Sequence, residues 1–173
     1  MKILAISGSL RAASSNTALL QTIARAMDPR AEMHLFGALG ILPPFDPDID
    51  EAAPPIITAF RATMAAADAV AISTPEYAHG VPGVLKNALD WLVGSGELYQ
   101  KPVVLLHVST RGEYARASLR EILITMGAKI ILEARARKPS EGLVAYPDEA
   151  LPALDIDTIA KTMIGLIQEP VVP

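Results

Sequence analysis

Short apolar runs alternate with amphipathic stretches along the chain, and this alternation constrains the fold more than any other feature. Five segments repeat apolar residues at the spacing of one helix face. Four of them use i, i+3, i+4 and i+7, as Leu20, Ile23, Ala24 and Met27 do and as Leu85, Ala88, Leu89 and Leu92 do, and the fifth has Ile56, Phe60, Met64 and Ala67. The runs between them have the length and apolar content of strands, at 2–7, 32–36, 69–73, 102–108 and 130–132. Strict alternation of this kind is typical of a parallel sheet covered by helices on both faces. We therefore predict a three-layer, doubly wound α/β sandwich that forms one domain over residues 1–173.

The composition excludes several classes of protein. The chain has no cysteine, so disulfides, thiolate metal sites and redox thiols are excluded, and any redox chemistry must come from a bound cofactor. A net charge of −4 gives no general attraction to nucleic acid or to anionic lipid. No stretch approaches the roughly 20 apolar residues of a membrane helix. The apolar run at the amino terminus is too short for a signal peptide, so we expect a cytoplasmic protein.

The loop after the first predicted strand leads into a helix and carries several hydroxyl groups and an arginine. Ligands of doubly wound sheets bind beyond the carboxyl ends of the strands, which places this loop at the expected site. A helix start offers unpaired N–H groups and a partial positive charge, and both suit a phosphate. Arg11 adds a guanidinium for phosphate oxygens. The hydroxyl groups that could donate to the same phosphate belong to Ser9, Ser14, Ser15 and Thr17.

The alternative for this loop is that Ser14 or Ser15 only caps the helix and that Arg11 is solvated, since such caps are common. The loop has neither the GxxxxGK[ST] pattern nor the GxGxxG pattern. This disfavours a Walker-type NTPase and a tight dinucleotide fold. A single monophosphate held by hydroxyl groups and one arginine fits the loop better.

The loop after the third predicted strand contains two prolines and two glycines within ten residues, 74–83. These residues hold the backbone rigid without regular pairing, so exposed N–H groups could meet the edge of a heteroaromatic ring. Tyr77 could supply an aromatic wall for that ring. The alternative is a surface turn before an amphipathic helix. His79 could be an acid or a base, but a loop histidine without such a role is commoner.

The other histidines and the tryptophan are interpreted as structural. His34 and His107 lie on strand patterns, and three scattered histidines do not form a metal site. Trp91 shares a helix with Leu85 and Leu92, which favours packing in the core or in a dimer. The least regular segment, 138–152, is predicted to be a surface loop.

Both loops resemble those of the NADPH-dependent FMN reductase family, which includes quinone and chromate reductases. The first loop matches the pattern GSLRxxSxN at Gly8, Ser9, Leu10, Arg11, Ser14 and Asn16. The second matches PEY…PGxLKNAxDW at Pro75, Glu76, Tyr77, Pro82, Gly83, Leu85, Lys86, Asn87, Ala88, Asp90 and Trp91. Segment 42–48 is similar to the family's loop after strand two. In all, the resemblance covers most of residues 1–132.

The resemblance implies a flavodoxin-like fold with strand order 2-1-3-4-5 and a non-covalently bound FMN. NADPH or NADH would reduce the flavin at N5, and a small acceptor such as a quinone would then take the electrons in a ping-pong reaction. No side chain is then required as a catalytic acid or base, and no metal is needed. Family members are commonly homodimers or homotetramers. The implied FMN-binding residues are Ser9, Arg11, Ser14, Ser15, Asn16, Thr17, Pro75, Glu76, Tyr77, Ala78, His79, Gly80 and Ser109.

Two departures from the family pattern affect the site. Ala78 stands where many members have asparagine, so backbone N–H groups must serve in place of that side chain. The loop 109–114 lacks the glycine pair found in many members, which leaves the shape of the third flavin-contacting loop open. Two other functions also stay open. One is a flavodoxin-type electron carrier without NAD(P)H activity, and the other is a reductase that releases reduced FMN to a partner monooxygenase.

Overall fold

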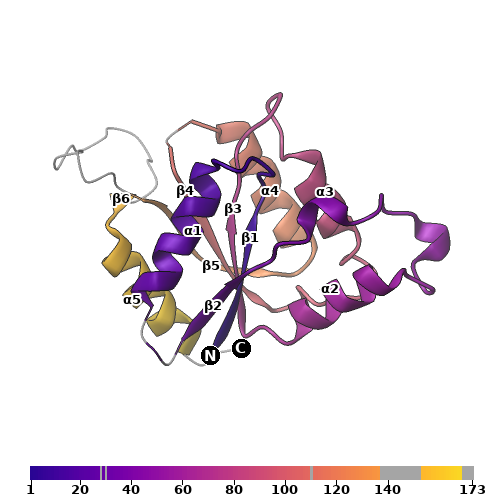
Figure 1. The fold of residues 1–173 in the computed structure, drawn as a ribbon, viewed down its shortest axis with the longest axis horizontal. Coiled ribbons are helices and arrows are strands. Elements are labelled where there is room, and N and C mark those ends of the chain that lie inside the picture. The colour runs from indigo at the N-terminus through magenta and orange to yellow at the C-terminus, as the bar shows by residue number, and fades with distance from the viewer. Residues whose placement is uncertain (28, 30, 110, 137–152, 169–173) are drawn as a thin grey trace.

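The computed structural model describes residues 1–27, 29, 31–109, 111–136 and 153–168, so the predicted surface loop at 138–152 lies outside the described residues. A parallel sheet forms the middle layer, with strands in the order β2-β1-β3-β4-β5-β6 (Figure 1). The strands are β1 (Lys2–Ser7), β2 (Glu32–Leu35), β3 (Ala69–Ser73), β4 (Pro102–His107), β5 (Lys129–Ala136) and β6 (Ala153–Leu154).

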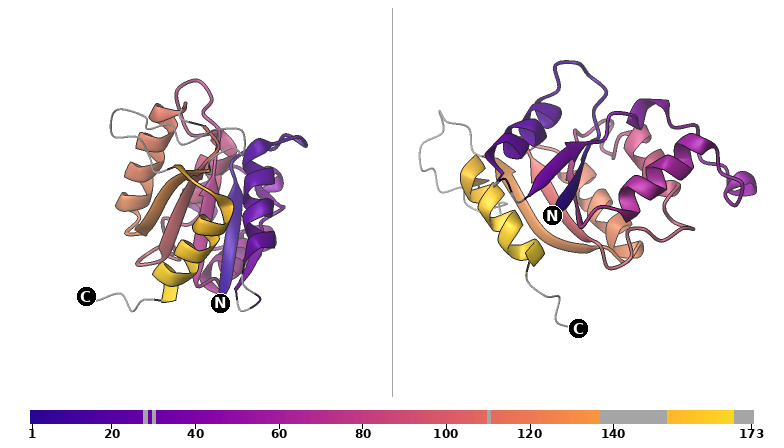
Figure 2. Two further views of the ribbon diagram at one scale, coloured as in Figure 1. Left: turned by 90° about the vertical axis from the view of Figure 1, so that its left-hand side faces the viewer. Right: turned by 60° about the horizontal axis from the view of Figure 1, so that its bottom comes forward.

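Helices cover both faces of the sheet. They are α1 (Ser15–Ala26), α2 (Pro55–Ala65), α3 (Gly83–Asp90), α4 (Glu113–Thr125) and α5 (Ile156–Gln168), with short 3-10 turns η1 (Leu39–Ile41) and η2 (Pro47–Ile49). Helices α1 and α5 lie on one side of the sheet and α2, α3 and α4 on the other, as Figure 2 shows in its right panel. The predicted three-layer sandwich and the order of its five strands are confirmed.

The layers form because the central strands are apolar on both faces. In β1, Ile3 and Ala5 pack against α1 and α5, whereas Leu4 and Ile6 pack against the helices of the opposite face. All five residues of β3 are buried. Successive side chains of a strand point to opposite faces, so a strand buried in this way needs helices on both sides.

The last two strands differ from the sequence prediction. Strand β5 continues to Ala136, beyond the predicted end at 132, through a stretch in which Glu133 and Arg135 interrupt the apolar pattern. Arg135 is nevertheless buried and Glu133 nearly so, and the carboxylate of Glu133 pairs with His107 and Arg120. The additional strand β6 has two residues, paired in parallel with β5, which is too short for any periodicity to show in the sequence.

The segment after β2 is anchored to α3 by two side chains that match the family pattern. Asn87 accepts a hydrogen bond from the backbone N–H of Phe45 at 2.7 Å and donates one to the carbonyl of Pro43 at 2.9 Å. The indole N–H of Trp91 donates to the same carbonyl at 2.9 Å. Trp91 is fully buried, so its predicted place in the core is confirmed. Prolines prevent the segment from pairing as a strand, and these side chains hold it instead.

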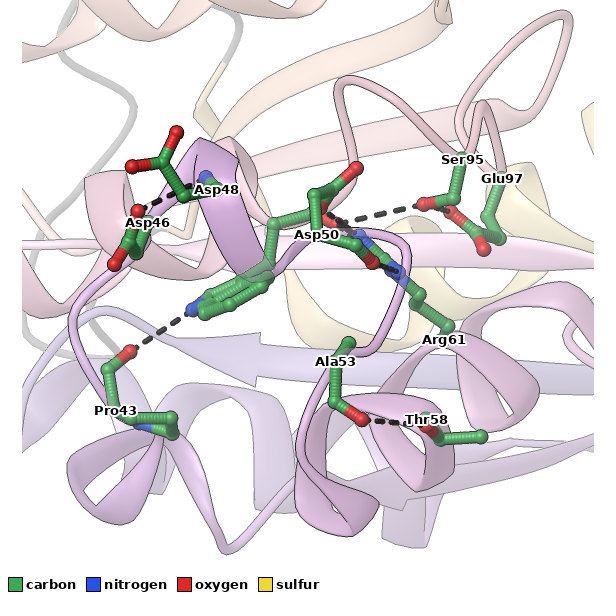
Figure 3. A network of polar contacts seen from close by, with 10 residues as sticks. Pro43, Asp46, Asp48, Asp50, Ala53, Thr58, Arg61, Ser95 and Glu97 are labelled. Carbon is green, nitrogen blue, oxygen red and sulfur yellow. Dashed lines mark hydrogen bonds and ion pairs between the residues drawn. The ribbon is translucent and has the colours of Figure 1, made fainter.

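Arg61 of α2 holds the end of the same segment, as Figure 3 shows. Its guanidinium forms an ion pair with Asp50 at 2.5 Å, and Nε donates to the carbonyl of Trp91 at 2.9 Å. The arginine thus links α2, the proline-rich segment and the end of α3.

Replacing Asn87 by alanine should lower the free energy of unfolding by about 1–3 kcal/mol, because it leaves the N–H of Phe45 and the carbonyl of Pro43 without that partner. Urea denaturation followed by circular dichroism measures the change. The control is Lys86→Ala on the same helix, which removes only an exposed ion pair with Asp90 and should cost at most about 0.5 kcal/mol. Equal costs for the two variants would contradict the anchoring role of Asn87.

Candidate functional site

The ends of β1 and β3 approach each other closely where the strand order reverses. The backbone N–H of Gly8 donates to the carbonyl of Ser73 at 2.9 Å, which continues the β1–β3 ladder into the loop. A Cβ at Gly8 would lie 2.2 Å from Oγ1 and 2.8 Å from Cβ of Thr74. Only glycine therefore allows the loop after β1 to pass this close to the loop after β3.

Helix α1 begins at a cluster of buried polar groups. Ser14 is the N-cap, and its Oγ accepts a hydrogen bond from the N–H of Thr17 at 3.3 Å. The hydroxyl of Thr17 donates to Oγ of Ser7 at 2.8 Å. Asn16, which is 5% exposed, accepts a bond from the hydroxyl of Ser73 at 2.9 Å and so ties α1 to β3. Ser14 therefore caps the helix, as the capping alternative proposed, and the hydroxyl of Thr17 bonds to the end of β1.

The same helix start retains features that suit an anion. Within the described residues, no hydrogen bond involves the backbone N–H of Ser15 or Asn16, and no acidic residue lies in the first turn of α1. Arg11 is exposed in the loop before the helix. Among the described residues, its guanidinium forms no ion pair. The local positive potential of the helix end is therefore not offset by a nearby carboxylate in its first turn.

The loop after β3 is closed by a two-residue turn. Tyr77 and Gly80 exchange backbone hydrogen bonds of 3.1 and 3.0 Å, and the two residues between them have positive φ, 48° at Ala78 and 57° at His79. This is the pattern of a type I′ turn, in which glycine and asparagine are usual. Neither residue here is of that kind, so each adopts the left-handed region at a cost of about 1–2 kcal/mol.

Two contacts attach this turn to α4. The carboxylate of Glu76 accepts a hydrogen bond of 2.8 Å from the N–H of Ala115 in the first turn of α4. Gly112 occupies the N-cap position of that helix, with φ of 97°. Because glycine has no side chain that could cap the helix, the carboxylate of Glu76 does so. The ring of His79 stacks on that of Tyr114 with centroids 4.3 Å apart and planes 7° apart. The loops after β3 and β4 are thus held together by side chains.

Three loops surround one cavity of about 380 Å³ at the carboxyl end of the sheet. Its walls come from the start of α1, the loop after β3, and the end of β4 with the loop and helix that follow. Of the predicted site residues, it brings together Ser15, Asn16, Pro75, Glu76 and Ser109. The remaining lining residues are Thr74, His107, Val108, Arg111, Gly112, Ala115 and Arg116.

Other predicted residues lie beside this cavity. Arg11 and Tyr77 line a neighbouring hollow of about 440 Å³ together with the glycine and proline that begin α3. Ala78 and His79 are exposed at the turn, next to Gly80. Ser9, Ser14 and Thr17 are placed in the polar cluster under the helix start, where the backbone N–H of Arg11 donates to the hydroxyl of Ser9 at 3.4 Å. The predicted residues therefore surround one end of the sheet but do not all line the same cavity.

His107 was interpreted from the sequence as a structural histidine, and the structure places it in the wall of the 380 Å³ cavity, at the end of β4. It is 5% exposed, and its Nε2 lies 3.1 Å from Oε1 of Glu133. The other oxygen of Glu133 accepts a hydrogen bond from Arg120. Its position at the carboxyl end of a central strand was the signal that could have identified it. His34, in contrast, is exposed on β2 and pairs with Glu32.

The effect of this pairing is seen in the pKa of Glu133. Burial alone would raise the pKa of Glu133, but the hydrogen bonds from His107 and Arg120 outweigh that effect and lower the pKa below its ordinary value. Glu133 is therefore ionised near neutral pH, beneath the cavity wall. Two further cations, Arg111 and Arg116, line the cavity itself.

The geometry fits a phosphorylated aromatic cofactor. The cavity has the volume of a small-molecule site and joins the N–H groups of α1 to the rigid loop after β3. No group of three or more metal-ligating side chains occurs within the described residues. Among the helices described, none is long and apolar enough to span a membrane.

Comparisons with known proteins agree with this geometry. The family model for NADPH-dependent FMN reductases matches residues 1–138. An NAD(P)H-dependent FMN reductase of Pseudomonas aeruginosa is 39% identical over 130 residues, which is 72% of this chain and 70% of that protein. A quinone reductase of Escherichia coli is 32% identical over 139 residues, or 76% of this chain and 73% of that protein.

A subunit of an NADH:(hydroxy)cinnamate reductase of Vibrio ruber is 36% identical over 127 residues, and the match spans 62% of that subunit's length. Among solved structures, the flavoenzyme NAD(P)H:(acceptor) oxidoreductase of Paracoccus denitrificans superposes with a TM-score of 0.68 at 26% identity, covering 96% of this chain and 92% of that one. The family model covers most of the chain, and the fold agrees with it. This chain therefore belongs to the NADPH-dependent FMN reductase family, and it is a flavodoxin-like oxidoreductase.

Proposed function

We propose that this chain is a single FMN-binding domain that transfers electrons from NAD(P)H to a quinone or a similar small acceptor in a ping-pong reaction. The observation that carries the proposal is the cavity in which the start of α1 and the loops after β3 and β4 meet. A phosphate site and a ring site at one end of the sheet are what FMN requires. Relatives named as FMN reductase and as quinone reductase support the substrate classes.

In this proposal the start of α1 holds the phosphate. The free N–H groups of Ser15 and Asn16, the hydroxyls of the loop and the guanidinium of Arg11 are the donors. The residues assigned to the phosphate are Ser9, Arg11, Ser14, Ser15, Asn16 and Thr17. Ser14 and Thr17 act partly by fixing the helix start, since their side chains already bond within the protein.

The loop after β3 orients the ring. Its closed turn presents backbone N–H groups without side-chain donors, and the capping bond from Glu76 to α4 keeps that turn next to Ser109 and the cavity. The residues assigned to the ring are Pro75, Glu76, Tyr77, Ala78, His79, Gly80 and Ser109. When bound, FMN supplies the two-electron chemistry, accepting a hydride from NAD(P)H and passing the electrons to the acceptor.

We further propose a homodimer or homotetramer in which a second subunit completes the walls of the site. Leu10 and Tyr77 are 58% and 50% exposed beside the neighbouring hollow, which is lined mainly by apolar residues and by glycine. Burial of such side chains against another copy would remove apolar surface from water.

The experiment that tests the function is an absorbance spectrum of the purified protein with added FMN, followed by steady-state assays with NADH or NADPH and a panel of quinones. We expect a bound flavin band and turnover with at least one pair of substrates, with parallel double-reciprocal lines. Bound FMN that NAD(P)H does not reduce would favour an electron carrier. Turnover without retained flavin would favour a reductase that releases reduced FMN.

Replacing Arg11 by alanine should weaken FMN far more than riboflavin, because only FMN carries the charge that the guanidinium pairs with. Loss of a charged hydrogen bond of roughly 1.5–3 kcal/mol corresponds to about 10- to 150-fold in the dissociation constant. Quenching of flavin fluorescence measures both ligands. Arg25→Ala, at the far end of α1, is the control and should change neither. Equal losses of FMN and riboflavin affinity in Arg11→Ala would rule out the phosphate assignment.

Replacing Gly8 by alanine should weaken FMN and riboflavin together. The added Cβ collides with Thr74 and separates the two loops, at a cost of about 1–3 kcal/mol in overpacking. The matched control is Gly37→Ala, because a Cβ there meets no atom within 4 Å. Flavin titrations and melting temperatures of both variants provide the comparison. Unchanged flavin affinity in a folded Gly8→Ala protein would show that the β1–β3 approach does not shape the site.

A further inference from the structure

His107, in the wall of the cavity, forms a buried ionisable pair with Glu133 that has no part in the reaction described above. His107 ends β4, two residues after Leu105, and therefore faces the side of the sheet that α4 covers. Its side chain is 6% exposed and that of Glu133 is 8% exposed. Because Nε2 is directed at Glu133, the ring has one further nitrogen, Nδ1, that can take up or release a proton.

Burial of ionisable side chains costs free energy unless the side chains are paired, and here specific partners pair them. Glu133 uses one oxygen for His107 and the other for Arg120 of α4. Arg135, the neighbour of His107 across the β4–β5 ladder, is 3% exposed. An apolar strand end would avoid these costs, so the cluster calls for a role beyond packing.

The charged and titratable groups around His107 come from β5, α4 and the loops after β3 and β4. Strand β5 contributes Glu133 and Arg135, and α4 contributes Arg120 and Arg116. The loop after β4 contributes Arg111. The loop after β3 contributes Glu76, whose carboxylate caps α4, and His79, which stacks on Tyr114. At the start of α1 the lining residues, Ser15 and Asn16, do not titrate.

Reduction of a flavin in this cavity changes the charge next to that cluster. A hydride carries two electrons and one proton, so its arrival adds one negative charge to the flavin. A nearby group that can accept a proton can compensate this charge. Among the residues that line the cavity, His107 can accept a proton at Nδ1, and the ionised carboxylate of Glu133 lies 3.1 Å from its Nε2.

We propose that His107, held by Glu133, takes up one proton when FMN bound in the cavity is reduced and releases it when the flavin is reoxidised. The proton comes from solvent and binds Nδ1, while NAD(P)H supplies the hydride and leaves as NAD(P)⁺. In the second half-reaction a quinone needs one hydride and one proton to become a quinol. The reduced flavin then holds the hydride, and His107 holds the proton. This inference rests on the proposed function.

The test is the pH dependence of the two-electron reduction equilibrium of bound FMN in the intact holoprotein, followed by spectroelectrochemistry. One proton per two electrons changes that equilibrium tenfold per pH unit, about 30 mV, and a second proton makes the change 100-fold. We expect the steeper dependence in the wild type within about pH 5–8. In His107→Gln the reduction equilibrium should change by closer to tenfold per pH unit, because an amide can still donate a hydrogen bond to Glu133 but cannot take up a proton.

A matched control separates His107 from a histidine outside the site. His34→Gln removes a histidine that also pairs with a glutamate but lies on exposed β2, and this variant should keep the wild-type pH dependence. Protonation of FMN itself contributes equally to the pH dependence of every variant. The difference between the wild type and His107→Gln therefore measures the proton that His107 takes up. Coincident curves for the wild type and His107→Gln would overturn the proposal.

Two further measurements apply if His107→Gln does not fold. Glu133→Gln removes the carboxylate that stabilises the protonated ring and should reduce the steepness. Nitrogen-15 spectra of labelled histidine in the wild-type holoprotein should show His107 gaining a proton on reduction, and an unchanged signal would refute the inference. A wild-type protein that binds no FMN would instead refute the proposed function, so the two failures are distinguishable.

Discussion

The close approach of β1 and β3 is the constraint on which the site depends. These strands are neighbours in the sheet although α1, β2 and α2 separate them in the chain. The loops that follow them diverge because α1 lies on one face of the sheet and α3 on the other. Gly8 allows the two loops to touch at the point of divergence, and Asn16 ties the helix after one strand to the end of the other through Ser73. The helix end that suits a phosphate therefore lies beside the loop that suits a ring.

A second set of contacts gives the site its third side. The carboxylate of Glu76 accepts a hydrogen bond from the first turn of α4. The stacked rings of His79 and Tyr114 also join the loop after β3 to α4. The stack contributes on the order of 0.5–1.5 kcal/mol, which offsets part of the strain at Ala78 and His79. Asparagine, which many family members have at position 78, adopts positive φ more readily than alanine. The departure at this position thus affects the backbone of the turn as well as the loss of a side-chain donor.

The elements and their order could be predicted because periodicity and breakers are local features. The strand at 69–73 and the helix marked by Leu85, Ala88 and Leu89 were predicted from apolar spacing alone. The loop motifs indicated where a phosphate and a ring would bind. The stack of His79 on Tyr114, the capping of α4 by Glu76 and the position of His107 join residues that are distant in sequence. Local patterns carry no information on such pairs, and β6 was too short to produce any pattern.

The central claim is that one cofactor spans the start of α1 and the loops after β3 and β4. A crystal structure of the protein grown with FMN tests it most directly. The account predicts the phosphate at the N–H groups of Ser15 and Asn16 within reach of Arg11, and the ring beside residues 75–80 and Ser109. Density for the phosphate away from α1, or for the ring outside these loops, would contradict the account.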